Sequence, residues 1–200
     1  MRMIIALASF LVFGFQPLMA DDVQDITKMT RDKIQVVIQI LRDKKIGKET
    51  RDKRIIEAAN PFFDFKKMAS ISLGKKYWTE MNKAQKQEFS DLFVTRLQES
   101  YLEKLDLYTD EEVTVADAKK VKNRIHILTQ LVSKDDKKDM LYKFYKTKKG
   151  WKVYDVVILG VSVVQTYRSQ FDGILRKGSI EDLLTKMRLK GQFKVPTGGK

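Results

Sequence analysis

The sequence predicts an α+β fold in which helices pack on the concave face of a curved antiparallel sheet of about four strands. Three observations support this class. Apolar residues recur at helical spacing from residue 23 to about residue 107, they alternate with polar residues after Thr109, and helical spacing returns after Ser162. Short loops join the successive strands, which favours antiparallel pairing. Such a cone-like arrangement is open at one end, and we expect an apolar cavity there.

The N-terminal half is typical of amphipathic helices with recognisable ends. Gly47 lies in a charged loop, Pro61 suits the first turn of a helix, and Gly74 suits a helix end. Asn82 is placed to cap the longest helix. We expect four helices in this half, over residues 23–42, 51–59, 61–74 and 83–107.

The second half contains the strands and two further helices. Gly150 follows two lysines in a hairpin turn, and Gly160 allows a sharp turn before Ser162, a good N-cap. Ser179 and Asp182 form a variant of the capping box that starts the last helix. We expect strands over residues 113–115, 121–132, 140–144 and 151–160.

The strand from residue 151 to residue 158 is apolar on both faces, so we expect cover on both sides. Its alternation assigns the side chains to two faces, Trp151, Val153 and Val157 on one and Tyr154, Val156 and Ile158 on the other. The helix that follows carries Val163, Tyr167 and Phe171. This apolar corner between strand and helix offers few reactive groups, which favours a pocket for an apolar molecule.

The N-terminus has the features of an export signal. Arg2 is followed by an apolar run over residues 4–15 and by a cleavage-like region before Asp21. An uncleaved anchor is the alternative, but a bilayer span needs about 20 apolar residues. We therefore expect residues 1–20 to be a cleavable signal peptide, residues 21–190 a single domain, and residues 191–200 a flexible polar tail. The chain has no cysteine, which excludes disulfides and thiol chemistry.

Lysine and arginine number 39 against 26 aspartate and glutamate residues, a net charge of +13. The basic residues are spread over every segment and are not interleaved with aromatic residues, so nucleic acid is not an expected partner. Two explanations remain open. The lysines form a solvated surface, or they attract a membrane surface or an acidic docking partner.

Catalytic residues are not prominent. His126 is the only histidine, and it lies on the less apolar face of its strand, where a structural or surface role is expected. A zinc site would need three or four ligands. Asp155 lies in an apolar strand, where burial would raise its pKa and make it a candidate general base beside Tyr154 or Tyr167. The alternative is a buried carboxylate satisfied by a backbone N–H or by Arg168. We expect no cofactor and no metal.

The sequence resembles the MlaC family of periplasmic phospholipid-binding, toluene-tolerance proteins over most of the chain from Val23 to Lys190. The matching residues are Pro61-Phe-Phe-Asp64-Phe65, Met68-Ala69, Leu73-Gly74, Trp78, Phe89, Phe93, Leu97, Tyr101, Trp151-Lys-Val-Tyr-Asp155, Gly160-Val-Ser162 and Tyr167-Arg168.

The resemblance implies a periplasmic carrier of glycerophospholipids that maintains outer-membrane lipid asymmetry. Its implied partners are an inner-membrane ABC transporter complex with an MCE-domain protein and an outer-membrane lipoprotein and porin complex. In that family the acyl chains lie between helices and a curved sheet, while the headgroup stays in water. Some relatives are tied to hopanoid lipids, so the lipid stays open. We expect a monomer.

The candidate cavity wall combines the resemblance with the apolar pattern. Arg168 either marks the rim at the headgroup or pairs with an acid such as Asp155. Val161 falls at a corner that borders the cavity in relatives. The candidate wall residues are Phe65, Met68, Phe89, Phe93, Leu97, Tyr101, Tyr142, Phe144, Tyr154, Val156, Ile158, Val161, Val163 and Tyr167.

Two other hypotheses follow from the same residues. An enzyme of the same cone-like fold could use Asp155 as a base on an apolar substrate such as a steroid or hopanoid, which requires Asp155 to face an open cavity. A structural envelope adaptor would have a filled core and no extractable ligand.

Overall fold

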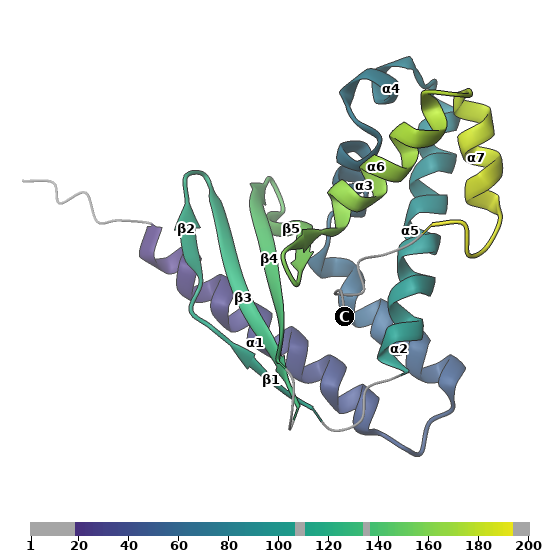
Figure 1. The fold of residues 1–200 in the computed structure, drawn as a ribbon. Coiled ribbons are helices and arrows are strands. Elements are labelled where there is room, and N and C mark those ends of the chain that lie inside the picture. Colours follow the sequence, from purple (N-terminus) through teal and green to yellow (C-terminus); the bar gives the residue numbers. More distant parts are fainter. Residues whose placement is uncertain (1–18, 107–110, 134–136, 194–200) are drawn as a thin grey trace, which may run out of the picture.

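The computed structural model describes residues 19–106, 111–133 and 137–193. Residues 1–18 of the predicted signal peptide and residues 194–200 of the predicted tail lie outside this description. Figure 1 shows the strands on one side of the molecule and α3–α7 on the other. The elements are α1 Met19–Arg42, α2 Lys48–Ala59, the 3-10 helix η1 Asn60–Phe62, α3 Phe65–Leu73, α4 Lys75–Glu80, α5 Lys83–Leu105, β1 Glu112–Val115, β2 Lys119–Val121, β3 Arg124–Val132, β4 Lys137–Thr147, β5 Gly150–Ile158, β6 Val161–Ser162, α6 Val163–Leu175 and α7 Ile180–Arg188.

The predicted helix ends are confirmed where the capping residue acts locally. The side chain of Asn82 accepts a hydrogen bond from the backbone N–H of Gln85 at 2.9 Å, and the Gln85 side chain accepts one from the backbone of Asn82 at 3.0 Å. Ser162 caps α6, and Ser179 forms a capping box with Asp182. Each cap satisfies backbone donors that the first helical turn leaves unpaired.

The helix predicted to begin at Pro61 begins instead at Phe65. Pro61 lies in η1, and Asp64 caps α3 by accepting a hydrogen bond from the Lys67 backbone at 2.9 Å. The Asp64 N–H donates to the carbonyl of Val153 at 2.9 Å, so the chain here pairs with β5 and is not helical. This pairing also covers part of the β5 edge, which would otherwise be open to other strands. The short helix α4 was not predicted.

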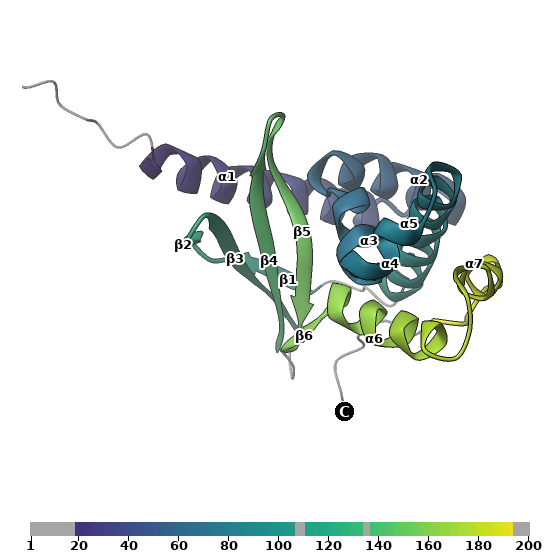
Figure 2. The ribbon, with the colours of Figure 1, turned by 90° about the horizontal axis from the view of Figure 1, so that it is seen from above.

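The sheet is antiparallel and has six strands, in the order β1-β3-β4-β5-β6, with β2 paired to β3. It is therefore larger than the predicted four strands. Lys122, with φ of 56°, turns the chain between β2 and β3 inside the single strand expected over residues 121–132. Gly160, with φ of 82°, returns β6 along β5. Figure 2 shows β6 leading directly into α6.

A bulge in β5 reverses part of the predicted face assignment. Phe144 pairs with Val153 and Lys143 pairs with Asp155, which leaves Tyr154 as the extra residue. Tyr154 packs on Tyr145, with ring centroids 5.8 Å apart, on the face away from the helices. Val153 and Val156 are both buried in the core. The prediction that Tyr154 shares a face with Val156 was wrong, because the bulge shifts the alternation by one residue.

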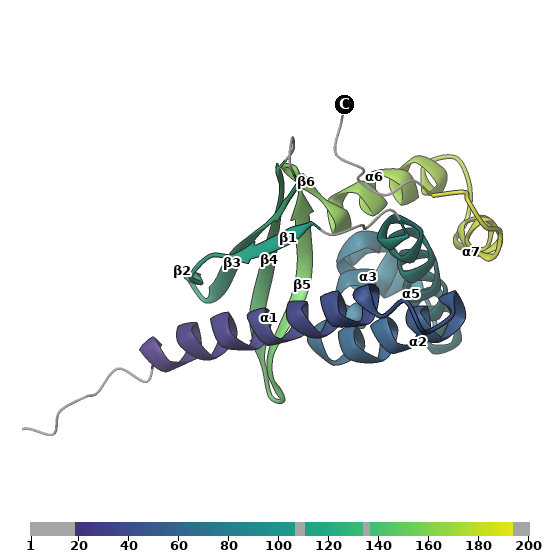
Figure 3. The ribbon, with the colours of Figure 1, turned by 90° about the horizontal axis from the view of Figure 1, so that it is seen from below.

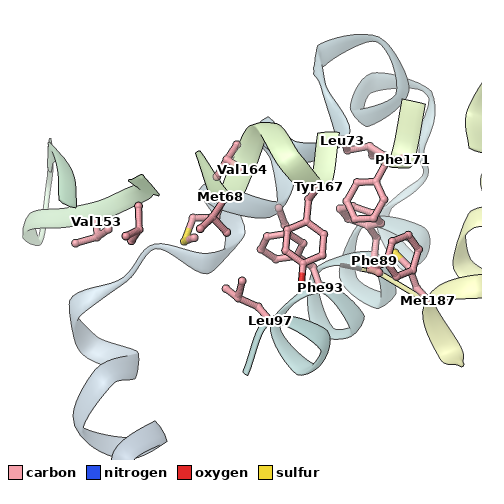
Figure 4. Close-up of a cluster of buried hydrophobic side chains, with 14 of the residues drawn as sticks. Met68, Leu73, Phe89, Phe93, Leu97, Val153, Val164, Tyr167, Phe171 and Met187 are labelled. Atoms are coloured by element: carbon pink, nitrogen blue, oxygen red, sulfur yellow. The ribbon is translucent and has the colours of Figure 1, made fainter. Parts of the chain in front are cut away.

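The helices form a closed core of their own. We define the helical core as Leu73, Phe89, Phe93, Phe171, Leu183, Leu184 and Met187, each at most 1% exposed. These side chains come from α3, α5, α6 and α7, and Figure 4 shows Leu73, Phe89, Phe93, Phe171 and Met187 grouped together. The ring of Phe89 packs edge-on against Phe171, with centroids 5.4 Å apart. Phe193 is also buried, 5.2 Å from the Phe171 ring, so the predicted loose tail does not begin before this residue.

Helix α1 connects the sheet to the helices. It crosses the sheet in Figure 3 and ends near α2. Ile26 is buried in the common core, and Thr27 accepts a hydrogen bond from the backbone of Ala118 at 3.0 Å. Asp22 accepts hydrogen bonds from the indole of Trp151 and the ammonium of Lys146, both at 2.9 Å. The first turns of α1 are thus attached to the sheet by polar contacts.

Candidate functional site

The helix-facing side of the sheet is apolar along most of its length. We define the sheet face as Ile125, Ile127, Met140, Tyr142, Phe144, Val153, Val156 and Ile158, which the strand register places side by side. Phe62 of η1 packs against it, with its ring 5.3 Å from Phe144 and 6.0 Å from Tyr142. Thus the aromatic residue after Pro61 covers the middle of the sheet face.

Exposure rises along one end of the sheet face. The register aligns Thr129, Met140, Ile158 and Val161 across four strands. Thr129 is fully buried, Met140 and Ile158 are partly exposed, and Val161 is 45% exposed. Its three apolar side chains, Met140, Ile158 and Val161, reach solvent and form a candidate entrance, because their surface is not fully covered by the protein's own core.

Helix α5 supplies the opposite wall. Phe93, Leu97 and Tyr101 follow one another at intervals of four residues, so they lie on one helix face. The ring of Phe93 packs against Tyr167 of α6, with centroids 5.1 Å apart. Tyr101, the last of the three, is only partly buried. The two walls therefore meet near α6 and become less buried toward Tyr101 and the exposed row.

The structure brings most of the predicted wall residues into one connected core and its border, and it places Tyr154 on the other side of the sheet. One connected core or its partly buried border contains Met68, Phe93, Leu97, Tyr101, Tyr142, Phe144, Val156, Ile158, Val163 and Tyr167. Phe89 lies in the helical core, between helices. Tyr154 lies on the other face of the sheet. Phe65 stacks on Phe63, with centroids 5.3 Å apart, at the border of a separate surface hollow.

That hollow has a volume of about 330 Å³ and combines aromatic and basic side chains. Its lining includes Phe63, Tyr145 and three lysines, Lys148, Lys149 and Lys152. The hydroxyl of Tyr145 donates to the carboxylate of Asp64 there. The predicted apolar cavity is a different place, since the hollow lies beside the β4–β5 hairpin. At the sheet face the predicted wall residues pack on one another.

Two tyrosine hydroxyls between the walls are buried without a hydrogen-bond partner among the described residues. They belong to Tyr101 and Tyr167. Burial raises the pKa of Tyr167 to about 12. Burial, followed by the nearby Tyr167 and Tyr142, raises the pKa of Tyr101 above its ordinary value. Both phenols are therefore neutral donors at physiological pH.

Asp155 is a structural carboxylate at the corner. Its oxygens accept hydrogen bonds from the Ser162 hydroxyl at 2.9 Å and from the Val164 N–H at 3.3 Å, and Lys143 pairs with it at 3.0 Å. These contacts fix the turn from β5 into α6. Asp155 is buried between Lys143 and the first turn of α6, so its oxygens are already engaged and are not open to a cavity as the enzyme hypothesis requires. The alternative of a buried carboxylate satisfied by a backbone N–H is confirmed, although the charged partner is Lys143 and not Arg168.

Arg168 lies elsewhere on α6, against the glycine that ends α3. A Cβ added at Gly74 would lie 3.3 Å from Nη2 of Arg168, and Gly74 has φ of 85°. Arg168 is exposed and packs where α3 meets α4. Its guanidinium therefore fills the space that the missing side chain of Gly74 leaves, and this contact could not be read from local spacing.

His126 lies on the outer face of the sheet, opposite Lys143 in the register and partly buried. Burial and the charge of Lys143 lower its pKa, so it is neutral near pH 7. In the described part of the chain no group of three metal-ligating side chains is found near it or elsewhere.

The chain is thus an α+β protein with a helix layer over one face of an antiparallel sheet, and that sheet face is apolar and partly exposed. The family model for the MlaC protein matches residues 31–189. The chain therefore belongs to the MlaC family.

Two similar proteins carry informative descriptions. The intermembrane phospholipid transport system binding protein MlaC of Haemophilus influenzae is 27% identical over 135 residues. That match covers 64% of this chain and only 62% of the relative. A phospholipid-binding protein from Ralstonia solanacearum, solved in complex with a phospholipid, superimposes with a TM-score of 0.72 at 19% identity. This match covers 81% of our chain and 94% of the other, and it shows that the fold is shared.

Among the residues that the structure describes, every helix is too short or too polar to span a bilayer.

Proposed function

We propose that this protein binds a phospholipid with its acyl chains between the sheet face and the wall formed by α5 and α6. The observation that carries the proposal is the row from Thr129 to Val161, in which the apolar side chains of Met140 and Ile158 are partly exposed and that of Val161 is 45% exposed. Membership of the MlaC family supports it, as does the relative that was solved with a phospholipid.

Binding requires the two walls to separate. Pockets for ligands of this size are on the order of 300–1,000 Å³. Burying a methylene is worth about 0.8 kcal/mol, so two acyl chains would bring a free energy large enough to offset the loss of contacts between the walls. Transfer from bilayer to protein exchanges one hydrocarbon environment for another, which keeps the net change small and allows both loading and release.

The location of the protein, the transport of the lipid and the partner complexes belong to the same proposal. We infer that residues 1–20 direct the chain to the periplasm, and that the protein carries phospholipid between outer-membrane and inner-membrane complexes of the envelope. The partners would be a porin and lipoprotein complex and an ABC transporter with an MCE-domain protein. The name of the Haemophilus relative supports intermembrane transport, and the basic surface suits an acidic docking partner.

The test is the substitution Val161→Glu. Because Val161 is exposed, the change should leave the unfolding free energy within about 0.5 kcal/mol. It should abolish phospholipid retention, since a carboxylate would have to enter hydrocarbon. Mass spectrometry of organic extracts from the purified protein measures the bound lipid.

Val36→Glu is the matched control, because Val36 is 40% exposed on α1 and is not part of the row. It should retain the wild-type amount of phospholipid. Equal lipid in folded Val161→Glu and in the wild type would contradict the proposal, as would a wild-type protein that carries none.

A further inference from the structure

The unpartnered hydroxyls of Tyr101 and Tyr167 stand out because they are phenols. Five side-chain polar atoms in the described residues are buried without a partner, on Thr30, Ser72, Arg96, Tyr101 and Tyr167. The hydroxyls of threonine and serine lie close to the carbonyls of their own helices, which small movements can bring into range. Arg96 already pairs with Glu99 through another nitrogen, at 2.7 Å. A phenol hydroxyl stands too far from its own backbone for such local relief.

These two hydroxyls lie inside the candidate site. Tyr167 is fully buried, and its hydroxyl points toward α5, beside Phe93 and Leu97, in Figure 4. Tyr101 lies one turn beyond Leu97 on the same helix face, with its ring partly exposed and its hydroxyl buried. One donor is thus deep between the walls, and the other lies toward the exposed row.

An unsatisfied buried donor costs about 1–3 kcal/mol, so two of them in one apolar site need an explanation. The hydroxyls are neutral. Ser100 lies near the Tyr167 hydroxyl and lowers its pKa, but the two side chains do not meet at ordinary hydrogen-bond geometry. A hydrocarbon chain could not satisfy the tyrosine hydroxyls, because it has no acceptor. A neutral acceptor that enters together with apolar chains would satisfy both hydroxyls.

We propose that Tyr101 and Tyr167 donate hydrogen bonds to the ester carbonyls that join the acyl chains to the glycerol of a bound phospholipid. The inference rests on the proposed function and adds a requirement to it. The protein reads the ester linkage itself. Because Tyr167 is fully buried, the glycerol end of the lipid is drawn below the surface, with the headgroup toward the exposed row. Lipids with the same chains and headgroup but ether linkages lack these carbonyls and bind less well.

The experiment compares two lipids on the wild-type protein. Delipidated protein is incubated with vesicles of dioleoyl phosphatidylglycerol or of its diether counterpart, separated from the vesicles in high salt, and assayed for bound phosphorus. One hydrogen bond is worth on the order of 1 kcal/mol, which is about a fivefold change in affinity. We expect the ester lipid to be preferred by roughly fivefold to twentyfold.

Tyr101→Phe and Tyr167→Phe remove the hydroxyls and keep the rings. Each should reduce the preference for the ester lipid by about fivefold, and the double variant should bind both lipids equally. Because the removed groups are unsatisfied in the lipid-free protein, its melting temperature should stay the same or rise. Tyr154→Phe, on the opposite face of the sheet, is the control and should keep the wild-type preference.

The outcomes separate the two proposals. Uptake of neither lipid by the wild type would overturn the proposed function. Equal uptake of both lipids by the wild type, or a full ester preference in the double variant, would overturn the role of the hydroxyls and leave lipid binding intact.

Discussion

The helical core and the sheet face are both apolar, but only the helical core is closed. Its seven side chains, from four helices, are at most 1% exposed. On the sheet face, Phe144 and Val153 are equally buried, whereas Met140, Tyr142 and Ile158 keep accessible surface. The helical core needs no further partner. The sheet face carries apolar surface beyond what packing within the chain uses.

The helical core therefore contributes mainly to the stability of the fold, whereas the sheet face has surface that is available for a ligand. A packed core loses several kcal/mol when a large side chain is removed, because the cavity only partly collapses. A partly exposed face loses less, since its side chains already contact water. For ligand binding we expect the opposite order. A substitution on the sheet face should weaken binding more than a substitution in the helical core.

Phe171→Ala should have the largest effect on stability. Phe171 is fully buried among Phe89, Tyr167 and Phe193. The substitution should lower the unfolding free energy by about 3–5 kcal/mol. Urea unfolding of delipidated and phospholipid-loaded protein measures this loss, which should be the same in both forms.

Phe171→Leu is the matched control and should lose less, because it leaves a smaller cavity. A loss in Phe171→Ala that appears only in the loaded form would contradict the assignment of Phe171 to a closed core.

Ile158→Ala should show the opposite pattern. Ile158 is partly exposed between Met140 and Val161, so the delipidated protein should lose only about 1 kcal/mol. In the loaded protein the same side chain would contact acyl chains, and the stabilisation that phospholipid provides should shrink as affinity falls. The difference in melting temperature between the loaded and the delipidated form measures the stabilisation that phospholipid provides. An unchanged difference would show that Ile158 does not contact the lipid.

Features encoded by neighbouring residues were predictable from the sequence. The caps at Asn82, Ser162 and Ser179 were predicted because each side chain bonds to the backbone three residues ahead. Gly74 was recognised as a helix end for a similar local reason. The apolar spacing along α1 and α5 was equally clear, because a helix repeats its own pattern.

Features that depend on distant partners were missed. The bulge that moves Tyr154 to the outer face depends on how β5 pairs with β4, and alternation within β5 alone cannot reveal it. The delayed start of α3 depends on the bond from Asp64 to Val153. The unpaired hydroxyls of Tyr101 and Tyr167 become visible only when α5 and α6 are packed together.

The smallest expected effect concerns the attachment of α1 to the sheet. Lys146, and after it Trp151, lower the pKa of Asp22 through their hydrogen bonds. Asp22→Asn keeps an acceptor for the indole and loses the ion pair with Lys146, whose side chain is 61% exposed. The loss at pH 7 should therefore be below about 1 kcal/mol, and it should decrease in high salt.

The pH dependence of this effect has a definite sign. Because the pKa of Asp22 is lower in the folded than in the unfolded protein, the ion pair contributes fully above the unfolded value near 3.8. The contribution is lost as the pH falls through the folded value. The unfolding free energies of wild type and Asp22→Asn, measured in urea from about pH 7 to about pH 3, should therefore converge at low pH. Asp32→Asn removes an exposed pair on the same helix and should match the wild type throughout. A difference in unfolding free energy between wild type and Asp22→Asn that stays constant with pH would mean that Asp22 attaches α1 through uncharged hydrogen bonds and not through the ion pair.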